Sequence, residues 1–470
     1  LGLEAAGPQE IEPEQLQRQI TLAARALIER RLAQQPLVIV VDDLQWADAA
    51  SIELFGRIAD QLSDRPLMLL LTQRAESPAW AGARVATSEI RLDALQGDQA
   101  RALVEALLGV AAHADPALAA LRDAVVARAC GNPLFVEEIV RGLVEAGALT
   151  CEDGQWRCAK STAVTAVPPT LYGLLLSRID RLGADERRAL QEAAVLGAEF
   201  DVQLLQRMAL RPTTSIAALP TLAAHGLIRS LGSQSAPSAT RWRFMHALLH
   251  EVVYENLLLV RRTELHGGVA AALEASLPAS DGAEAGPRRL AELEALGHHW
   301  SLSTDKLRGA RYLLAAADWA RSVYANQDAL RHCERALQTL ADAGSEATPD
   351  AETTATEHDA RERIADLLAL QGRRAEALAQ FEYVAQAARA GAAATRHARV
   401  LRKIGGLHWE VGAREPARAC FDAGLDALGA DGDPIERAHL FQEMGRLAFR
   451  AGDNATAVAY GLERTGRIIT

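Results

Sequence analysis

The chain is short of several features that would place it in a familiar class. No apolar run approaches the length of a membrane-spanning helix, and no signal-peptide pattern opens the sequence. The five cysteines are odd in number and form no Cys-x-x-Cys pair, which is typical of reduced thiols rather than of a disulfide framework or a zinc site. Aromatic residues make up only 4%, which favours an Ala- and Leu-rich helical protein over a β-sandwich. We expect a cytoplasmic protein.

Length and charge set further bounds. At 470 residues the chain is long enough for about three domains of ordinary size. The net charge of −11 argues against a surface built for broad contact with phosphate backbones. The sequence begins at Leu1 without Met and stops within a repeat, so we expect a piece of a longer protein.

The most informative stretch is an apolar run that leads directly into two carboxylates. Residues Leu37 to Val41 are rich in Val and Ile and do not alternate, which predicts a strand buried on both faces of a parallel sheet. Asp42 and Asp43 follow at its carboxyl end, where open α/β sheets bind ligands. In a nucleotide hydrolase this place needs one carboxylate for Mg²⁺, and a second can orient the attacking water. The simpler alternative is a buried strand that ends in a solvated acidic turn.

A second strand follows after a helical segment. Residues 49–62 have the apolar spacing of a helix, and residues 66–72 form another buried run. Together they predict a strand–helix–strand unit with parallel strands. Arg74 follows the second strand at the same edge of the sheet as Asp42, where a cation can sense a terminal phosphate. The alternative is that Arg74 is simply a surface arginine. We also expect a short strand at 88–92 and a helix at 98–108.

Two blocks of sequence resemble one protein class specifically. Val-Asp-Asp-Leu-Gln-Trp-Ala-Asp-Ala-Ala-Ser at 41–51 resembles the Walker B block of signalling ATPases of the STAND class, in particular those of LuxR-type large regulators and cyclase-linked multidomain proteins. Gly131-Asn132-Pro133 and the residues after it resemble the GxP block of that class, whose proline lies against adenine. The same residues predict a break between two helices, because Asn132 precedes a proline and Pro133 suits the first turn of the next helix, and the simpler alternative is only such a helix corner. Thr72-Gln73-Arg74 is similar to its sensor segment. The resemblance implies ATP or ADP with Mg²⁺ as cofactors, Asp42 as metal ligand, and Asp43 and Arg74 as catalytic residues.

The Walker A phosphate cradle of that class is missing. Such a cradle has the pattern Gly-x-x-x-x-Gly-Lys-Ser/Thr, and no lysine precedes Lys160. One near-match at 154–161 has Ala159 where the second glycine belongs and lies after the Walker B block instead of before it. We predict instead a hairpin in which residues 149–151 pair with 155–158. The chain alone is therefore expected to be inactive and to bind ATP weakly or not at all, whereas the parent protein is an ATPase.

Beyond Pro168-Pro169 the order of elements is that of a winged helix. Four helices are predicted at 171–182, 184–196, 202–208 and 216–225, and two strands at 226–231 and 241–244. The helix 216–225 offers no Arg, Lys, Asn or Gln to DNA bases, so direct nucleic-acid binding is not expected. His246 lies in a segment similar to the one whose histidine reaches the nucleotide phosphates in this class, and its alternative is a core histidine.

The last two hundred residues carry a repeat. Gly372, Gly412 and Gly452 recur at a step of 40 with similar flanking residues, as in stacked helical hairpins of the tetratricopeptide type. His298-His299 could suggest a metal, but no acidic or Cys partner has ligand spacing, so packing is the expectation. Residues 341–356 are expected to form a flexible connection.

These segments predict an α/β fold class (a partial P-loop NTPase core) followed by all-α structure with a winged helix and a tetratricopeptide-like α-solenoid. The expected domains are 1–112, the carboxyl-terminal part of the core; 113–165, a helical bundle with the GxP motif; 166–262, the winged helix; and 263–470, the repeats.

The function that the resemblance implies is an ATP/ADP-dependent signalling switch with a cyclase or LuxR-type output. Its expected partners are a nucleotide, a protein or small-molecule signal on the repeats, and further copies of itself, without a membrane. The alternative is a non-hydrolysing interaction scaffold with a vestigial nucleotide core.

Overall fold

The computed structural model describes residues 13–47, 49–74, 88–108, 116–152, 155–158, 170–209, 212–231, 241–277, 286–343, 350–429 and 432–468. The chain divides into two compact units, residues 1–181 and 182–470. None of the helices in these ranges is both long and apolar enough to cross a membrane.

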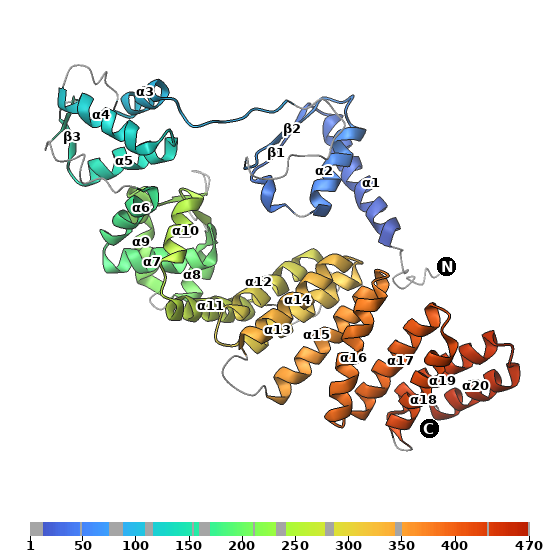
Figure 1. The fold of residues 1–470 in the computed structure, drawn as a ribbon. Helices are drawn as coiled ribbons and strands as arrows, with labels where there is room; N and C mark the ends of the chain where they lie inside the picture. Colours follow the sequence, from blue (N-terminus) through green and yellow to red (C-terminus); the bar gives the residue numbers. More distant parts are fainter. Residues whose placement is uncertain are drawn as a thin grey trace, which may run out of the picture. The chain divides into compact units, whose positions relative to one another are not determined.

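The first unit begins with a small α/β element. Its parts are α1 (Pro13–Leu32), β1 (Leu37–Val41), the 3₁₀ turn η1 (Leu44–Trp46), α2 (Ala49–Gln61) and β2 (Leu67–Leu71). The two strands pair in parallel, with Leu37 opposite Leu67 and Val41 opposite Leu71 (Figure 1). Parallel strands need a crossover between them, and α2 supplies it. The predicted strand–helix–strand unit is confirmed.

The burial of this sheet differs from the prediction. Successive side chains of a strand point to opposite faces, and here one face is half-buried while the other is exposed. The exposed face carries four large apolar side chains that are each 45–60% exposed: Val38, Val40, Met68 and Leu70. The expectation that the first strand is buried on both faces is therefore wrong for the described residues, because no described element covers the second face.

The rest of the first unit is helical with one hairpin. Its elements are α3 (Gly97–Leu108), α4 (Pro116–Ala129), α5 (Pro133–Glu145), β3 (Leu149–Glu152), β4 (Gln155–Cys158) and α6 (Leu171–Asp180). Their apolar side chains share one core, which includes Val104, Leu121, Val125, Val136 and Ile139.

Two predictions fall in this part of the chain. The antiparallel pairing of Leu149 with Cys158 confirms the hairpin, and it makes the described part of the 154–161 near-match a strand rather than a phosphate loop. The strand expected at 88–92 is wrong. That segment is coil, with Ile90 82% and Leu92 93% exposed, and an apolar run without a neighbouring strand has no partner for its backbone groups.

The second unit opens with helices around a small antiparallel sheet. The elements are α7 (Ala184–Leu196), β5 (Glu199–Asp201), α8 (Val202–Met208), α9 (Pro212–Ala224), β6 (Ile228–Ser230), β7 (Arg241–Phe244) and α10 (Ala247–Glu255). The strand order is β5-β7-β6, with Phe200 opposite Trp242 and Ile228 opposite Phe244. The helices α6 to α9 and the strands β6 and β7 follow the prediction, although α9 begins at Pro212 instead of at 216. Strand β5 was missed, since three residues carry no periodic signal.

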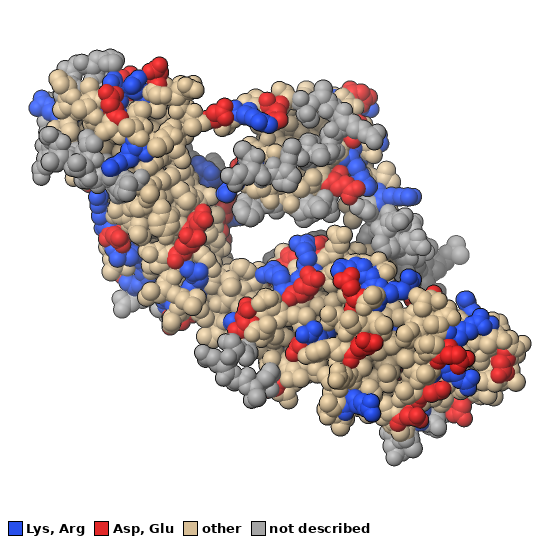
Figure 2. Space-filling model, in the orientation of Figure 1, with Lys and Arg blue, Asp and Glu red and all other residues tan. Residues whose placement is uncertain are grey.

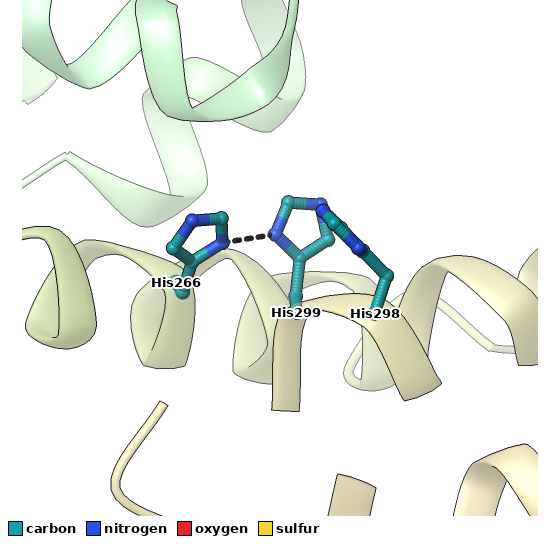
Figure 3. A group of neighbouring side chains, drawn as sticks. All are labelled: His266, His298 and His299. Carbon is teal, nitrogen blue, oxygen red and sulfur yellow. Dashed lines mark hydrogen bonds between the residues drawn. The ribbon is translucent and has the colours of Figure 1, made fainter. Parts of the chain in front are cut away.

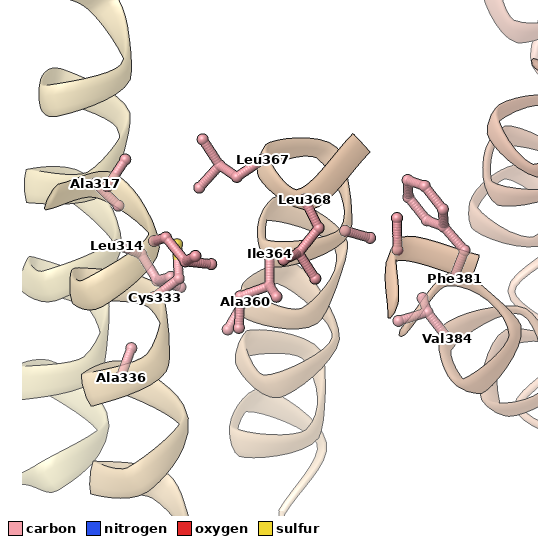
Figure 4. Close-up of a cluster of buried hydrophobic side chains, with 14 of the residues drawn as sticks. Leu314, Ala317, Cys333, Ala336, Ala360, Ile364, Leu367, Leu368, Phe381 and Val384 are labelled. Carbon is pink, nitrogen blue, oxygen red and sulfur yellow. The ribbon is translucent and has the colours of Figure 1, made fainter. Parts of the chain in front are cut away.

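Stacked helices complete the second unit. They are α11 (Leu259–Glu274), α12 (Gly286–Ser301), α13 (Lys306–Ser322), α14 (Asn326–Ala343), α15 (Ala351–Leu370), α16 (Arg374–Ala390), α17 (Ala394–Glu410), α18 (Arg414–Leu428), α19 (Pro434–Arg450) and α20 (Asn454–Ile468). Successive helices pack on one another (Figure 1). Figure 4 shows how small and large apolar side chains of α13 to α16, such as Ala360 and Phe381, fill the space between them.

The repeat predicted from the glycines is confirmed. Gly372, Gly412 and Gly452 have φ values of 76°, 78° and 84° and stand in the turns of the pairs α15–α16, α17–α18 and α19–α20. A side chain is strained in that backbone region, which is why glycine recurs there. The flexible connection expected at 341–356 is wrong at both ends. Helix α14 continues to Ala343, and α15 starts at Ala351 and already buries Thr356, so a composition rich in polar residues is overridden by packing. Residues 344–349 lie outside the described ranges.

The observed architecture confirms the predicted fold class in its main features, a partial α/β core followed by an all-α solenoid.

Candidate functional site

The two predicted carboxylates stand at the carboxyl end of β1. Asp42 and Asp43 are both exposed there. Asp43 has φ 57° and ψ 50°, the left-handed helical region, which few residues other than glycine adopt and which Asp tolerates better than most. Such a conformation costs about 1–3 kcal/mol and is maintained only where surrounding contacts impose it. Contacts around the turn after β1 therefore impose this backbone conformation on Asp43.

Thr72, the first residue after β2, supplies those contacts. Its backbone N–H donates to the carbonyl of Val41 (3.0 Å), and its own carbonyl accepts from the N–H of Leu44 (2.8 Å). Its hydroxyl accepts from the N–H of Asp43 (2.9 Å) and donates to a carboxylate oxygen of Asp42. One side chain therefore links the carboxylate of Asp42 to the backbone of Asp43. The sequence comparison placed Thr72 in a sensor segment, and its bonds to Asp42 and Asp43 emerge only from the structure.

Gln45 extends this network to the third predicted residue. Its side-chain N–H donates to Oδ1 of Asp43 (2.7 Å), and its side-chain oxygen accepts from the backbone N–H of Arg74 (3.3 Å). The guanidinium of Arg74 is exposed. The structure thus brings Asp42, Asp43 and the backbone of Arg74 together at one edge of the sheet, as the parallel strands predicted. Sequence reasoning gave Gln45 no separate role.

The donor atoms at this edge suit a hard cation. Carboxylate and hydroxyl oxygens are the ligands that Mg²⁺ prefers, and it binds proteins through one or two carboxylates while it keeps water or phosphate oxygens as its other ligands. Asp42, Asp43 and Thr72 offer such a set on an exposed edge. These residues therefore fit a magnesium–phosphate ligand.

The Gly131-Asn132-Pro133 turn starts α5 in the manner predicted. Gly131 has φ 77°, and a Cβ atom at this position would lie 2.6 Å from the carbonyl oxygen of Leu95. Its own carbonyl accepts from the N–H of Leu95 (2.8 Å). Asn132 caps the helix by accepting from the N–H of Phe135 (3.2 Å), and Pro133 is the first helical residue. Only glycine fits between the segment before α3 and the start of α5.

A buried cluster of charged side chains links α5 to α6. Arg178 of α6 is 3% exposed and pairs with Glu138, which is 1% exposed, and it also donates to both carboxylate oxygens of Glu145 (2.8 and 3.1 Å). A fork of parallel N–H···O bonds fixes orientation as well as distance. The sequence held no signal for this cluster, because partners 33 and 40 residues apart show no helical spacing.

His246 belongs to the second unit. It is the residue before α10, it is half-buried, and its carbonyl accepts from the N–H groups of Leu249 (3.1 Å) and His250 (3.4 Å). The contact with nucleotide phosphates predicted for its side chain stays a prediction.

Two protein families match parts of the chain. Residues 2–71 match the AAA ATPase domain, and residues 96–157 match a domain of unknown function, DUF8739. The first match spans β1, the two carboxylates and β2. It confirms the resemblance to an ATPase domain for this segment, and the stacked helices of the second unit confirm the predicted repeat region.

Individual proteins are similar over larger parts. An uncharacterized protein of Rhizobium meliloti (strain 1021) is 28% identical over 260 residues, which cover 54% of this chain and 24% of that protein. The chain thus spans about a quarter of the length of this relative.

Solved structures with similarity include a Signal Transduction ATPase with Numerous Domains (STAND) protein with a tetratricopeptide repeat sensor from Pyrococcus horikoshii. It is 13% identical with a TM-score of 0.39, over 97% of this chain and 66% of that chain. Another is aspartyl phosphate phosphatase F from Bacillus subtilis, 9% identical with a TM-score of 0.35, over 63% of this chain and 75% of that chain.

Proposed function

We propose that the chain is part of an ATP-driven signalling switch of the STAND class. The single observation that carries this proposal is the network at the end of β1, in which Thr72 links Asp42 and Asp43 beside Arg74. Asp42 would hold Mg²⁺, Asp43 would orient the attacking water, and Arg74 would sense the terminal phosphate. The cation would neutralise the phosphate charge that builds up during hydrolysis.

The other predicted site residues complete the proposal. Gly131 and Pro133 form a rigid turn whose proline would lie against the adenine, and His246 would reach the phosphates. We keep the four-part division at 112/113, 165/166 and 262/263 as a proposal, with the elements from α6 to α10 as its winged helix. Further strands and helices of the ATPase core would cover the exposed apolar face of β1 and β2 in the full-length protein.

The repeats would act as the sensor. A ligand or partner on α12 to α20 would favour one of two arrangements of the switch, and ATP and ADP would bind these arrangements with different affinity. The active state would self-associate. The output, a nucleotide cyclase or a LuxR-type transcription regulator, belongs to this proposal as well. The setting would be the cytoplasm.

Nucleotide binding on a pair of proteins tests the proposal. The chain as given is expected to bind Mg²⁺-ATP weakly or not at all, since no cradle holds the triphosphate. The same chain extended by its native upstream sequence is expected to contain Gly-x-x-x-x-Gly-Lys-Ser/Thr about a hundred residues before Asp42 and to bind and hydrolyse ATP.

Two substitutions in the extended protein locate the site. Asp42→Asn is expected to lower Mg²⁺-dependent turnover at least about a hundredfold, because charge stabilisation at the phosphates is lost. Asp64→Asn is the matched control, since Asp64 is exposed in the loop between α2 and β2 and should leave turnover unchanged. Micromolar ATP affinity of the chain as given, or equal turnover of the two variants, would refute the proposal.

The second candidate is an interaction scaffold that does not hydrolyse ATP. It is favoured by the exposed setting of Asp42 and Asp43 and predicts an intact upstream sequence without a phosphate cradle. Direct DNA binding by residues 168–262 is not favoured. The segment 216–225 carries no Arg, Lys, Asn or Gln for DNA bases, and on the face drawn in Figure 2 basic and acidic side chains are interspersed. A shift of generic duplex DNA at low salt would bring that function back.

A further inference from the structure

Three histidines from two helices meet in the second unit. His266 comes from α11, and His298 and His299 come from α12, and one ring nitrogen from each lies within 4.8 Å of the others (Figure 3). His266 is 1% and His299 9% exposed, whereas His298 is open to solvent. Within the described residues no other group of three potential ligand side chains comes together in this way.

The ring nitrogens are spaced almost as ligands of one ion. Nδ1 of His266 and Nδ1 of His299 are 2.8 Å apart and share a hydrogen bond. Zinc binds histidine nitrogen at about 2.0–2.1 Å, so two nitrogens on a tetrahedral ion are separated by about 3.3 Å. An ion would therefore require ring rotations that widen the 2.8 Å pair and bring the third nitrogen, within 4.8 Å of the others, to a similar separation.

Burial lowers the pKa of each of the three histidines. Burial lowers the pKa of His266 to about 4 and that of His299 to about 3. Burial and then the charge of Arg335 lower the pKa of His298. At neutral pH all three imidazoles are uncharged. One of the two hydrogen-bonded Nδ1 atoms carries the shared proton, which must move to the Nε2 atom of its ring before both Nδ1 atoms can bind an ion.

One side chain already orients the innermost ring. The hydroxyl of Tyr254 lies 2.9 Å from Nε2 of His266, on the side of the ring away from His299. Histidine ligands usually donate their second N–H to an oxygen, which fixes the tautomer. Arg262, whose guanidinium lies 4.6 Å from the Tyr254 ring centre, and Arg335 oppose a cation, so binding should be weaker than at a thiolate site.

We propose that His266, His298 and His299 form a binding site for a divalent transition-metal ion that prefers nitrogen ligands, with zinc as its expected occupant. Three histidines leave a fourth position, which faces solvent beside His298. An ion here would join α11 to α12, where the part that contains the sheet continues into the stacked helices. The alternative is that no ion binds and that the three histidines are packed, neutral rings that hydrogen-bond to one another.

Metal titration of the full chain separates these possibilities. The protein is stripped with a chelator, its thiols are blocked with iodoacetamide, and Co²⁺ is added while the visible absorption of tetrahedral cobalt is followed, with Zn²⁺ as competitor. We expect one Co²⁺ per chain, displaced by one equivalent of Zn²⁺. We also expect Zn²⁺ to raise the unfolding midpoint, because it binds only the folded state.

Two variants and a control locate the ion. His298→Ala removes an exposed side chain, should keep its helical circular dichroism, and should lower Co²⁺ affinity at least tenfold. Tyr254→Phe should lower it about 10–100-fold through the lost outer hydrogen bond. The control is His439→Ala, because His439 is 51% exposed on α19 and far along the sequence from the cluster. No saturable equivalent, or equal affinity in His298→Ala and His439→Ala, would overturn the proposal.

Discussion

The buried ion cluster on α5 is predicted to hold the Gly131–Pro133 turn in place. Arg178 is the only described cation with three charge-assisted bonds to Glu138 and Glu145 together. Arg178→Ala would leave the carboxylate of Glu138, 1% exposed, without its buried partner. Removing one member of a buried pair destabilises by about 3–5 kcal/mol, because the charge left behind is poorly solvated. Arg141, which is 36% exposed and lies 3.8 Å from Glu138, places the expected loss at the lower end of that range.

Hydrogen exchange on the full chain measures this loss locally. Every 1.4 kcal/mol is a factor of ten, so amides of α5 and α6 should exchange about 10²- to 10³-fold faster in Arg178→Ala than in the original chain. The matched control is Arg181→Ala, which removes an exposed arginine three residues further on and should leave exchange unchanged.

A second variant tests the physical reason. Arg178→Met combined with Glu138→Leu removes both charges and fills the space with apolar atoms, so exchange should return to within about tenfold of the original chain. If Arg178→Ala behaves like Arg181→Ala, or if the double variant is no better than the single one, the unpaired charge does not govern the stability of α5.

Three further outcomes are expected. Gly131→Ala should destabilise the start of α5 by about 1–3 kcal/mol, because the new Cβ would lie 2.6 Å from a backbone oxygen. Gly142→Ala is the control and should not destabilise it, since a Cβ there would have no atom within 4 Å. Hydrogen exchange compares the two variants. Burial lowers the pKa of His266 to about 4 and of His299 to about 3, from 6.5 in the unfolded chain. Below pH 6.5 the unfolded state therefore binds more protons than the folded state. The free energy of unfolding should fall as the pH drops from 6.5 toward 4. Urea unfolding at pH 7.5 and 5 measures this fall, and an equal midpoint in a His299→Asn variant and the original chain at both pH values would contradict it. Burial raises the pKa of the Cys333 thiol to about 12, so a maleimide at neutral pH should label the two exposed cysteines and spare Cys333 in the folded chain, as mass spectrometry of peptides can establish.

Local sequence determined those parts of the protein that depend on short spacing. The run from Leu37 to Val41 predicted a strand. The two acids that follow it necessarily lie at its carboxyl end, because the direction of the chain places them there. The glycines at 372, 412 and 452 predicted the turns of three helix pairs, since only a residue without Cβ adopts that backbone cheaply. Asn132 and Pro133 likewise predicted the start of α5.

Tertiary structure decided everything that joins distant residues. Thr72 bridges Asp42 and Asp43 from 30 and 29 residues away, and His266 meets His299 from 33 residues away, and no periodicity in the sequence encodes either distance. Burial of the sheet could not be predicted from its apolar residues, because covering a face requires another element to pack on it. Spacing along the chain specifies helices, strands and turns, whereas sites arise where packing brings such elements together.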